Sequence, residues 1–267
     1  MNNRKSFSST NFLIYDESIF KDLKFFITGF YGLGLCGYLT TKILYDAAAL
    51  ADKLKRIAII WSDSVPPIVE VDNSGKFRYP IEAYIVDSSS AILFFRYQPS
   101  TDLQISVADK LTDLARKHDL TLILCGGIDI NALPNRDKED VDIVYVCNSA
   151  FENRYIKESN SWDVPKSPPE IVVSGGIALI LMHAELKNVP AVSLLTPTIA
   201  RAGYMDYLAS LKLAKRLIKI FNMDLSLEPI EDQIHRAEAQ RFLQMMKSRK
   251  KEEKVEEIEE PEEFGIT

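Results

Sequence analysis

The chain has 267 residues, 46% of them hydrophobic and 26% charged, so it is long enough to bury a sizeable core without disulfides or metal. Its formal net charge is −6, but residues 252–267 hold eight Glu and one Lys, a net of −7, which leaves +1 for the remainder. A body this close to neutral argues against nucleic acid as the main partner. No stretch reaches the roughly 18 uncharged apolar residues of a membrane-spanning helix. Residues 1–12 are polar and lack the apolar core of a signal peptide, so we expect a cytoplasmic protein with no membrane partner.

Apolar periodicity and turn residues predict an alternation of strands and helices. In chain order these are a short strand at 12–15, a strand at 24–28, a helix over 35–54, a strand at 56–61, a hairpin of 68–71 and 77–81, strands at 83–87 and 91–95, a helix over 102–118, strands at 120–125 and 141–146, a helix over 174–188, a strand at 191–195 and a helix over 204–221. The polar, proline-containing segment 148–169 is typical of a loop. The alternation predicts an α/β fold whose sheet is mostly parallel and covered on both faces, with the hairpin at one edge.

The two ends of the chain differ in composition from its middle. We divide the sequence into an N-terminal extension over 1–22, an α/β domain over 23–229 and a charged tail over 230–267. Within the tail, residues 230–255 are helix-forming, and the Glu-rich stretch 256–267 is expected to be disordered.

The most distinctive local pattern is a run of glycines, Gly29, Gly32, Gly34 and Gly37, which follows a strand and opens a helix. The last three match G-x-G-x-x-G, in which glycines let the main chain approach a pyrophosphate at a helix N-terminus. Asp63, at the end of the next strand, would be the ribose-binding carboxylate, although it comes later than that pattern prefers. The alternative is a structural turn that allows close helix–sheet packing. Because no proton-transfer group accompanies the pattern, we favour the structural role and expect no cofactor.

No other pattern predicts catalysis or metal binding. The three histidines, His118, His183 and His235, are scattered and fit no metal-ligand spacing. Ser174 precedes two glycines at a helix start but lacks the G-x-S-x-G elbow of a hydrolase, so helix capping is the better interpretation. Cys36 lies near a helix N-terminus without a base beside it in the sequence, and all three cysteines are expected to be buried free thiols. We therefore expect no catalytic residue, no metal and no enzyme.

Four segments of the sequence, taken in their order along the chain, point to a known protein family. They are a strand, glycine turn and helix over 25–46; a strand, Pro-Pro step and hairpin over 57–81; a Gly-rich turn, helix and strand over 174–198; and a closing helix over 202–221, with Asp206 near its start. Together they resemble the archaeal proteasome assembly chaperone family, and the similarity extends over residues 20–228. Each segment alone is weak, and the shared order makes the resemblance specific.

This resemblance implies a phosphorylase/hydrolase-like three-layer α/β/α sandwich without catalysis. It implies a homo-oligomeric chaperone or scaffold in proteasome core-particle assembly, with proteasome subunits or another assembly protein as partner. Family members that dock on the proteasome end in a hydrophobic residue, Tyr and any residue. This chain has Ile266 at the tyrosine position, which favours a scaffold-like paralogue and argues against direct docking. The alternative is a nucleotide- or dinucleotide-binding enzyme that uses the turn between Gly32 and Gly37.

Self-association also fits apolar residues placed in expected loops and edges, namely Ile68, Val69, Phe77 and Tyr79. An oligomer would cover such residues.

The tail offers a second interaction candidate. Its apolar residues suit an adaptable contact with a partner protein, because Met side chains are flexible. The alternative is a solvated helix that keeps the protein soluble. The residues expected to bind a partner are Phe242, Leu243, Met245 and Met246 on the helix, and Phe264 and Ile266 at its end.

Overall fold

The computed structural model describes residues 10–72, 74–134, 142–157, 162–201 and 203–240. The chain divides into two compact units, Met1–Leu227 and Glu228–Thr267. The first unit contains the sheet and its helices, and the second has a helix over the described residues 228–240. Within these described stretches, no helix is both long enough and apolar enough to cross a membrane.

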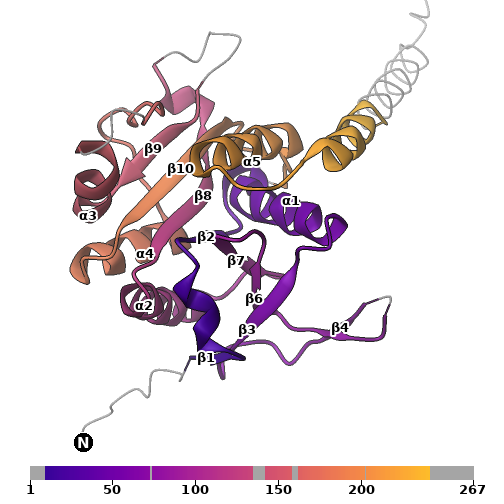
Figure 1. Cartoon of the computed structure of the whole chain (residues 1–267). Helices are drawn as coiled ribbons and strands as arrows, with labels where there is room; N and C mark the ends of the chain where they lie inside the picture. The colour runs from indigo at the N-terminus through magenta and orange to yellow at the C-terminus, as the bar shows by residue number, and fades with distance from the viewer. Residues whose placement is uncertain (1–9, 73, 135–141, 158–161, 202, 241–267) are drawn as a thin grey trace, which may run out of the picture. The chain divides into compact units, whose positions relative to one another are not determined.

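An eight-stranded sheet forms the centre of the first unit (Figure 1). From edge to edge its strands are β1 (Asn11–Ile14), β3 (Lys55–Trp61), β6 (Ile81–Ile85), β7 (Ser90–Phe95), β2 (Phe25–Gly29), β8 (Thr121–Asp129), β10 (Ala191–Thr198) and β9 (Val144–Cys147). The pairs β7–β2, β2–β8 and β8–β10 are parallel, and the pairs outside them are antiparallel. The α/β class is confirmed. The sheet was predicted to be mostly parallel, but parallel pairing is confined to its four central strands, and the sheet as a whole is mixed. The short turn 86–89 leaves no room for the crossover that would make β6 and β7 parallel.

The predicted hairpin exists, but its position was wrong. β4 (Glu70–Val71) and β5 (Phe77–Arg78) form a two-stranded sheet of their own, and the edges of the main sheet are β1 and β9. Pro80, which has no N–H group to donate to a ladder, separates β5 from β6.

Four long helices accompany the sheet of the first unit. They are α1 (Cys36–Leu50), α2 (Thr101–Lys117), α4 (Gly175–Leu186) and α5 (Tyr207–Phe221). α1 packs with α5, and α2 packs with α4. Figure 1 shows the strands lying between the two pairs. Phe26 and Ile27, which are successive residues of β2 and point to opposite faces of the sheet, are both fully buried.

Local sequence signals fix where two of these helices begin. The Ser100 and Asp206 side chains accept hydrogen bonds from main-chain N–H groups in the first turns of α2 and α5. Behind α2 and α4 lies the main core, where Leu111 and Ile180 belong to one buried cluster with Leu122 of β8. Burial of this apolar surface contributes most of the free energy that stabilises the packing of the helices on the sheet.

Two stretches contain helical turns that the sequence did not predict. The expected strand at 12–15 is β1, and the 3-10 helix η1 (Glu17–Lys21) follows it with Phe20 buried. Two further 3-10 turns are η2 (Leu33–Leu35) and η3 (Ile130–Ala132). The expected loop 148–169 contains α3 (Ser149–Phe151) and the π-helical η4 (Glu152–Lys157), so that prediction was wrong there. Aromatic packing accounts for the helical structure here, because Phe151 is fully buried and its ring centroid lies 5.2 Å from that of Trp162.

Candidate functional site

The glycine turn between β2 and α1 is a tight reversal of the main chain. The Leu35 N–H donates to the Gly32 carbonyl at 2.9 Å, and Gly34 and Leu35 both adopt left-handed conformations, with φ of 60° and 53°. A Cβ on Gly34 would lie 2.5 Å from Oγ1 of Thr198 and 2.9 Å from Sγ of Cys36. Both conformation and space therefore favour glycine at this position.

Two other glycines of the turn allow main chains to touch. A Cβ on Gly37 would overlap the carbonyl oxygen of Cys125 on β8, and a Cβ on Gly29 would overlap the Gly37 carbonyl. The first turn of α1 therefore rests directly on the sheet. Gly32 differs, because nothing lies within 4 Å of an added Cβ there. These contacts support a structural role for Gly29, Gly34 and Gly37.

A cleft of 520 Å³ lies beside this turn, between the carboxyl end of β8 and the start of α4. It is lined by Gly32 of the turn, by Gly127 and by Gly175 and Gly176. Asp63 is not brought to it. Asp63 follows β3, and two strands, β6 and β7, separate β3 from β2. A Rossmann-type site needs the strand that follows the first helix to neighbour the first strand, so this arrangement does not favour the dinucleotide interpretation.

The chemistry-bearing residues considered from the sequence do not converge. Burial, and secondarily the nearby Asp206 carboxylate, raises the pKa of Cys36 to about 12, so this thiol stays protonated at neutral pH. Cys36 and Cys125 are buried as expected, whereas Cys147 is only half-buried. Ser174 stands at the N-cap of α4 but makes no capping bond with its side chain. In the part of the chain that is described, no three His, Cys, Asp or Glu side chains group as metal ligands.

A buried ionic network lies beneath the hairpin and was not anticipated from the sequence. The Glu82 side chain on β6 is 0% exposed. Its Oε1 accepts from Nη1 of Arg56 at 2.7 Å, and its Oε2 accepts from Nη2 of Arg96 at 3.1 Å and from the Tyr84 hydroxyl at 2.6 Å. A buried carboxylate with this many partners is compensated for the water it has lost.

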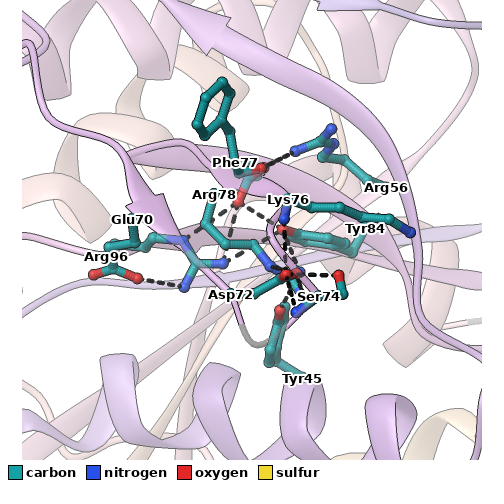
Figure 2. Close-up of polar contacts among 11 residues, drawn as sticks. Tyr45, Arg56, Glu70, Asp72, Ser74, Lys76, Phe77, Arg78, Tyr84 and Arg96 are labelled. Carbon is teal, nitrogen blue, oxygen red and sulfur yellow. Dashed lines mark hydrogen bonds and ion pairs between the residues drawn. The ribbon is translucent and has the colours of Figure 1, made fainter.

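The same two arginines reach the hairpin itself. Nη1 of Arg56 donates to the Phe77 carbonyl at 2.9 Å, and Nη1 of Arg96 donates to Glu70 at 3.4 Å, as Figure 2 shows. The β4–β5 hairpin is therefore tied to the main sheet by side chains, since it shares no ladder with it.

The hairpin turn is also tied to helix α1. Arg78 donates through Nε to Asp72 at 3.0 Å and through Nη1 to the Tyr45 hydroxyl of α1 at 2.7 Å (Figure 2). Hydrogen bonds from the Ser74 hydroxyl and from the Lys76 and Ser74 main-chain N–H groups, with the Arg78 charge, hold the pKa of Asp72 well below its usual range. Asp72 is thus a carboxylate at any physiological pH, and the hydrogen bonds that it accepts within the turn are retained.

This support holds apolar side chains out in solvent. Phe77 is 56% exposed and Val71 62%, and Ile68 and Val69 beside β4 are exposed as well. A hollow of 300 Å³ next to Phe77 is lined by Arg56, among other residues of the network. Of the apolar residues expected at an oligomer contact, Tyr79 alone is partly covered.

The six tail residues expected to bind a partner lie outside the described residues; they are Phe242, Leu243, Met245, Met246, Phe264 and Ile266. The network had a sequence signal that was missed. Glu82 is the one charge inside the apolar strand β6, and Arg96 directly follows the apolar strand β7. A charge at a position that the strand pattern buries indicates a partner elsewhere in the fold.

Comparisons with known proteins agree with the geometry. Among solved structures, the chain is similar to Pyrococcus furiosus PbaA, described as an archaeal homolog of proteasome-assembly chaperone, with a TM-score of 0.71 and 20% identity over 94% of this chain and 99% of that chain. The chain is also similar to Pyrococcus furiosus PbaB, described as an archaeal proteasome activator, with a TM-score of 0.65 and 18% identity over 89% of this chain and 98% of that chain. For a Mycobacterium tuberculosis proteasome-assembly chaperone homologue, the TM-score is 0.51 and the identity is 12%, over 90% of this chain and 97% of that chain.

At these identities the structural likeness shows a shared fold. No curated protein matches the sequence. The model of the PAC2 family matches residues 26–243, which is most of the chain, and the resemblance inferred from four ordered segments is thereby confirmed. The chain belongs to the PAC2 family.

Proposed function

We propose that this protein is a non-enzymatic assembly chaperone or scaffold, a cytoplasmic homo-oligomer that helps to assemble the proteasome core particle. Its partners would be proteasome subunits or another assembly protein. The family and the descriptions of PbaA and the mycobacterial homologue support this. The single observation that carries the proposal is the hairpin, where a buried ionic network holds apolar side chains in solvent. Apolar surface fixed in this way suits a protein–protein contact.

Two finer parts of the proposal concern architecture. The pairing of α1 with α5 and of α2 with α4 supports a phosphorylase/hydrolase-like three-layer sandwich. The division into an extension over 1–22, a domain over 23–229 and a tail over 230–267 remains our proposal. So does partner capture by the tail, through Phe242–Met246 and the pair Phe264 and Ile266.

Affinity purification of the tagged full-length protein from its native cell, followed by mass spectrometry, tests the function. We expect core-particle subunits or a second assembly factor in the eluate, and light scattering should give the mass of several chains. A Phe264→Ala/Ile266→Ala variant should capture less. A monomer at tens of micromolar, an assumed working range for specific assembly, together with an eluate free of such proteins would contradict the proposal.

The second candidate is a nucleotide- or dinucleotide-binding enzyme, which the 520 Å³ cleft between two glycine-rich segments favours. Thermal unfolding with NAD, NADP and ATP separates the two. A ligand at about 100 times its dissociation constant adds about 2.7 kcal/mol to the free energy of unfolding. We expect no such rise, and a saturable one would favour the enzyme.

A further inference from the structure

The exposed apolar side chains of the hairpin are continuous with the edge of the main sheet. Val71 and Phe77 are register partners in the β4–β5 pair, so their side chains lie on one face. The Arg56 guanidinium, which donates to the Phe77 carbonyl, lies 5.7 Å from the centroid of the Tyr15 ring. Tyr15, which follows β1, is 54% exposed. Arg56 therefore joins the hairpin to the end of β1.

The register of the sheet extends this surface. Leu13 lies opposite Ile59, and Ile59 lies opposite Glu82, so the three form one row across β1, β3 and β6. Leu13 is thus on the face where Glu82 meets the hairpin arginines, and Trp61, two residues after Ile59, is on the same face. Leu13 and Trp61 are both exposed. The hairpin surface, as we call it, consists of Leu13, Tyr15, Trp61, Ile68, Val69, Val71 and Phe77.

Basic groups lie beside this hairpin surface. The hollow next to Phe77 is lined by three basic side chains, Arg56, Lys76 and Arg78, and by one acidic side chain among its described residues, Asp72. Glu82, which offsets part of the Arg56 charge, is buried. Lys76 is exposed. At the hollow, this region therefore offers apolar surface with a basic rim, which complements an acidic segment that also carries apolar side chains. Glu70, between Val69 and Val71, is an exposed acidic group, and its charge is offset by Arg96.

The chain contains such a segment. Residues 252–267 hold eight Glu and one Lys, interspersed with Val255, Ile258, Phe264 and Ile266. Fully extended, this segment spans about 50 Å, enough to cross both the hollow and the apolar surface. We propose that the hairpin surface binds the acidic segment 252–267 of a second copy of this chain. The inference rests on the proposed function, in which the protein self-associates, and it names the surface and the segment that meet.

In the bound arrangement, Phe264 packs on the apolar side chains around Phe77, and the Glu residues before it lie along the basic rim. Aromatic anchors in such patches contribute most of the affinity, whereas rim charges set orientation and association rate. The contact should therefore weaken as ionic strength rises without vanishing.

Site-specific photo-cross-linking in the full-length protein tests this. Phe264 is replaced by p-benzoylphenylalanine, and this copy is mixed with an excess of nitrogen-15-labelled protein before irradiation and mass spectrometry. We expect cross-links from position 264 of the unlabelled copy to labelled peptides that contain residues 13–15, 61 or 68–79.

Variants in the labelled copy sharpen the result. Phe77→Ser should reduce the cross-link by about tenfold, and Lys76→Glu should reduce it more at low salt than at high salt. Val172→Ser is the matched control, since Val172 is 86% exposed outside the hairpin surface, and it should leave the yield unchanged. Thermal unfolding of each variant checks that the fold is retained.

Several results would overturn the inference: cross-links confined to one copy, cross-links that avoid the hairpin surface, or a yield insensitive to Phe77→Ser. Light scattering on the same samples separates this failure from that of the proposed function. Oligomers without hairpin cross-links would leave the scaffold proposal standing and remove this contact. Monomers throughout would remove both.

Discussion

The glycine turn and the hairpin are held in place by opposite means. At the turn, missing side chains let the first turn of α1 rest on β8, so that Gly37 lies against the Cys125 carbonyl. At the hairpin, long side chains reach across to a buried carboxylate, Glu82, and the apolar groups point outward. At Gly29, Gly34 and Gly37 the turn therefore has almost no room for an added atom, whereas Gly32 is open. On the outer face of the hairpin, Val71 and Phe77 are exposed, so substitutions there should leave the fold intact.

Breaking the network should have the largest effect on stability. Glu82→Ala leaves Arg56 and Arg96 partly buried without their shared carboxylate, and we expect a loss of about 3–5 kcal/mol in the free energy of unfolding. Urea denaturation measures it. Glu70→Ala, which removes only an exposed partner of Arg96, should cost at most about 1 kcal/mol. Equal losses in the two variants would mean that the buried carboxylate does not hold the hairpin.

The next largest effect should come from the turn. Gly34→Val places a branched side chain where φ is 60° and Thr198 Oγ1 lies 2.5 Å from the new Cβ, so we expect a loss of about 1–3 kcal/mol. Gly32→Val, where nothing lies within 4 Å, serves as the control and should cost clearly less. Thermal unfolding compares them. Similar stabilities would show that the turn is not under steric constraint.

A smaller effect is expected at the start of α5. Asp206 accepts from the Ala209 N–H at 2.9 Å and from the Thr198 hydroxyl at 2.7 Å. Asp206→Ala should cost about 1 kcal/mol through loss of this cap, while Asp206→Asn keeps an acceptor and should cost less. Denaturant midpoints resolve the difference, and an order reversed between the two variants would contradict the capping role.

The smallest effect on stability should come from the outer face of the hairpin. A Val71→Ser/Phe77→Ser variant alters two exposed side chains, so its free energy of unfolding should stay within about 1 kcal/mol of the parent. Its self-association, followed by light scattering across a dilution series, should fall markedly. Unchanged association in this stable variant would place the contact between copies elsewhere.

Local signals in the sequence predicted most elements but not their neighbours. β2, the turn and α1 are contiguous, and their apolar periodicity and glycines lie within one window. That two strands, β6 and β7, lie between β3 and β2 depends on pairing between distant segments, which no local pattern records. The same holds for the hairpin, whose strands are two residues long and whose position depends on side chains of β3 and β7.

The candidate site was predictable in part. Ile68, Val69 and Phe77 were identified as uncovered apolar residues, and all three are exposed. The charges beneath them were overlooked. Glu82 and Arg96 interrupt apolar runs, but the pairing of β6 with β7, which brings them together, is not recorded in the local sequence. The segment 149–157 was missed because its anchor, Phe151, packs on Trp162 beyond the local window.

The burial of the cysteines affects how readily their thiols react with oxidants and alkylating reagents. Oxidants and alkylating reagents attack the thiolate, and burial raises the pKa of Cys36 to about 12 and that of Cys147 to about 11, while Cys125 is fully enclosed. All three sulfurs are thus kept in their unreactive form at neutral pH. We expect thiol reagents to modify the buried Cys36 and Cys125 only as the protein unfolds, and to reach the half-buried Cys147 first.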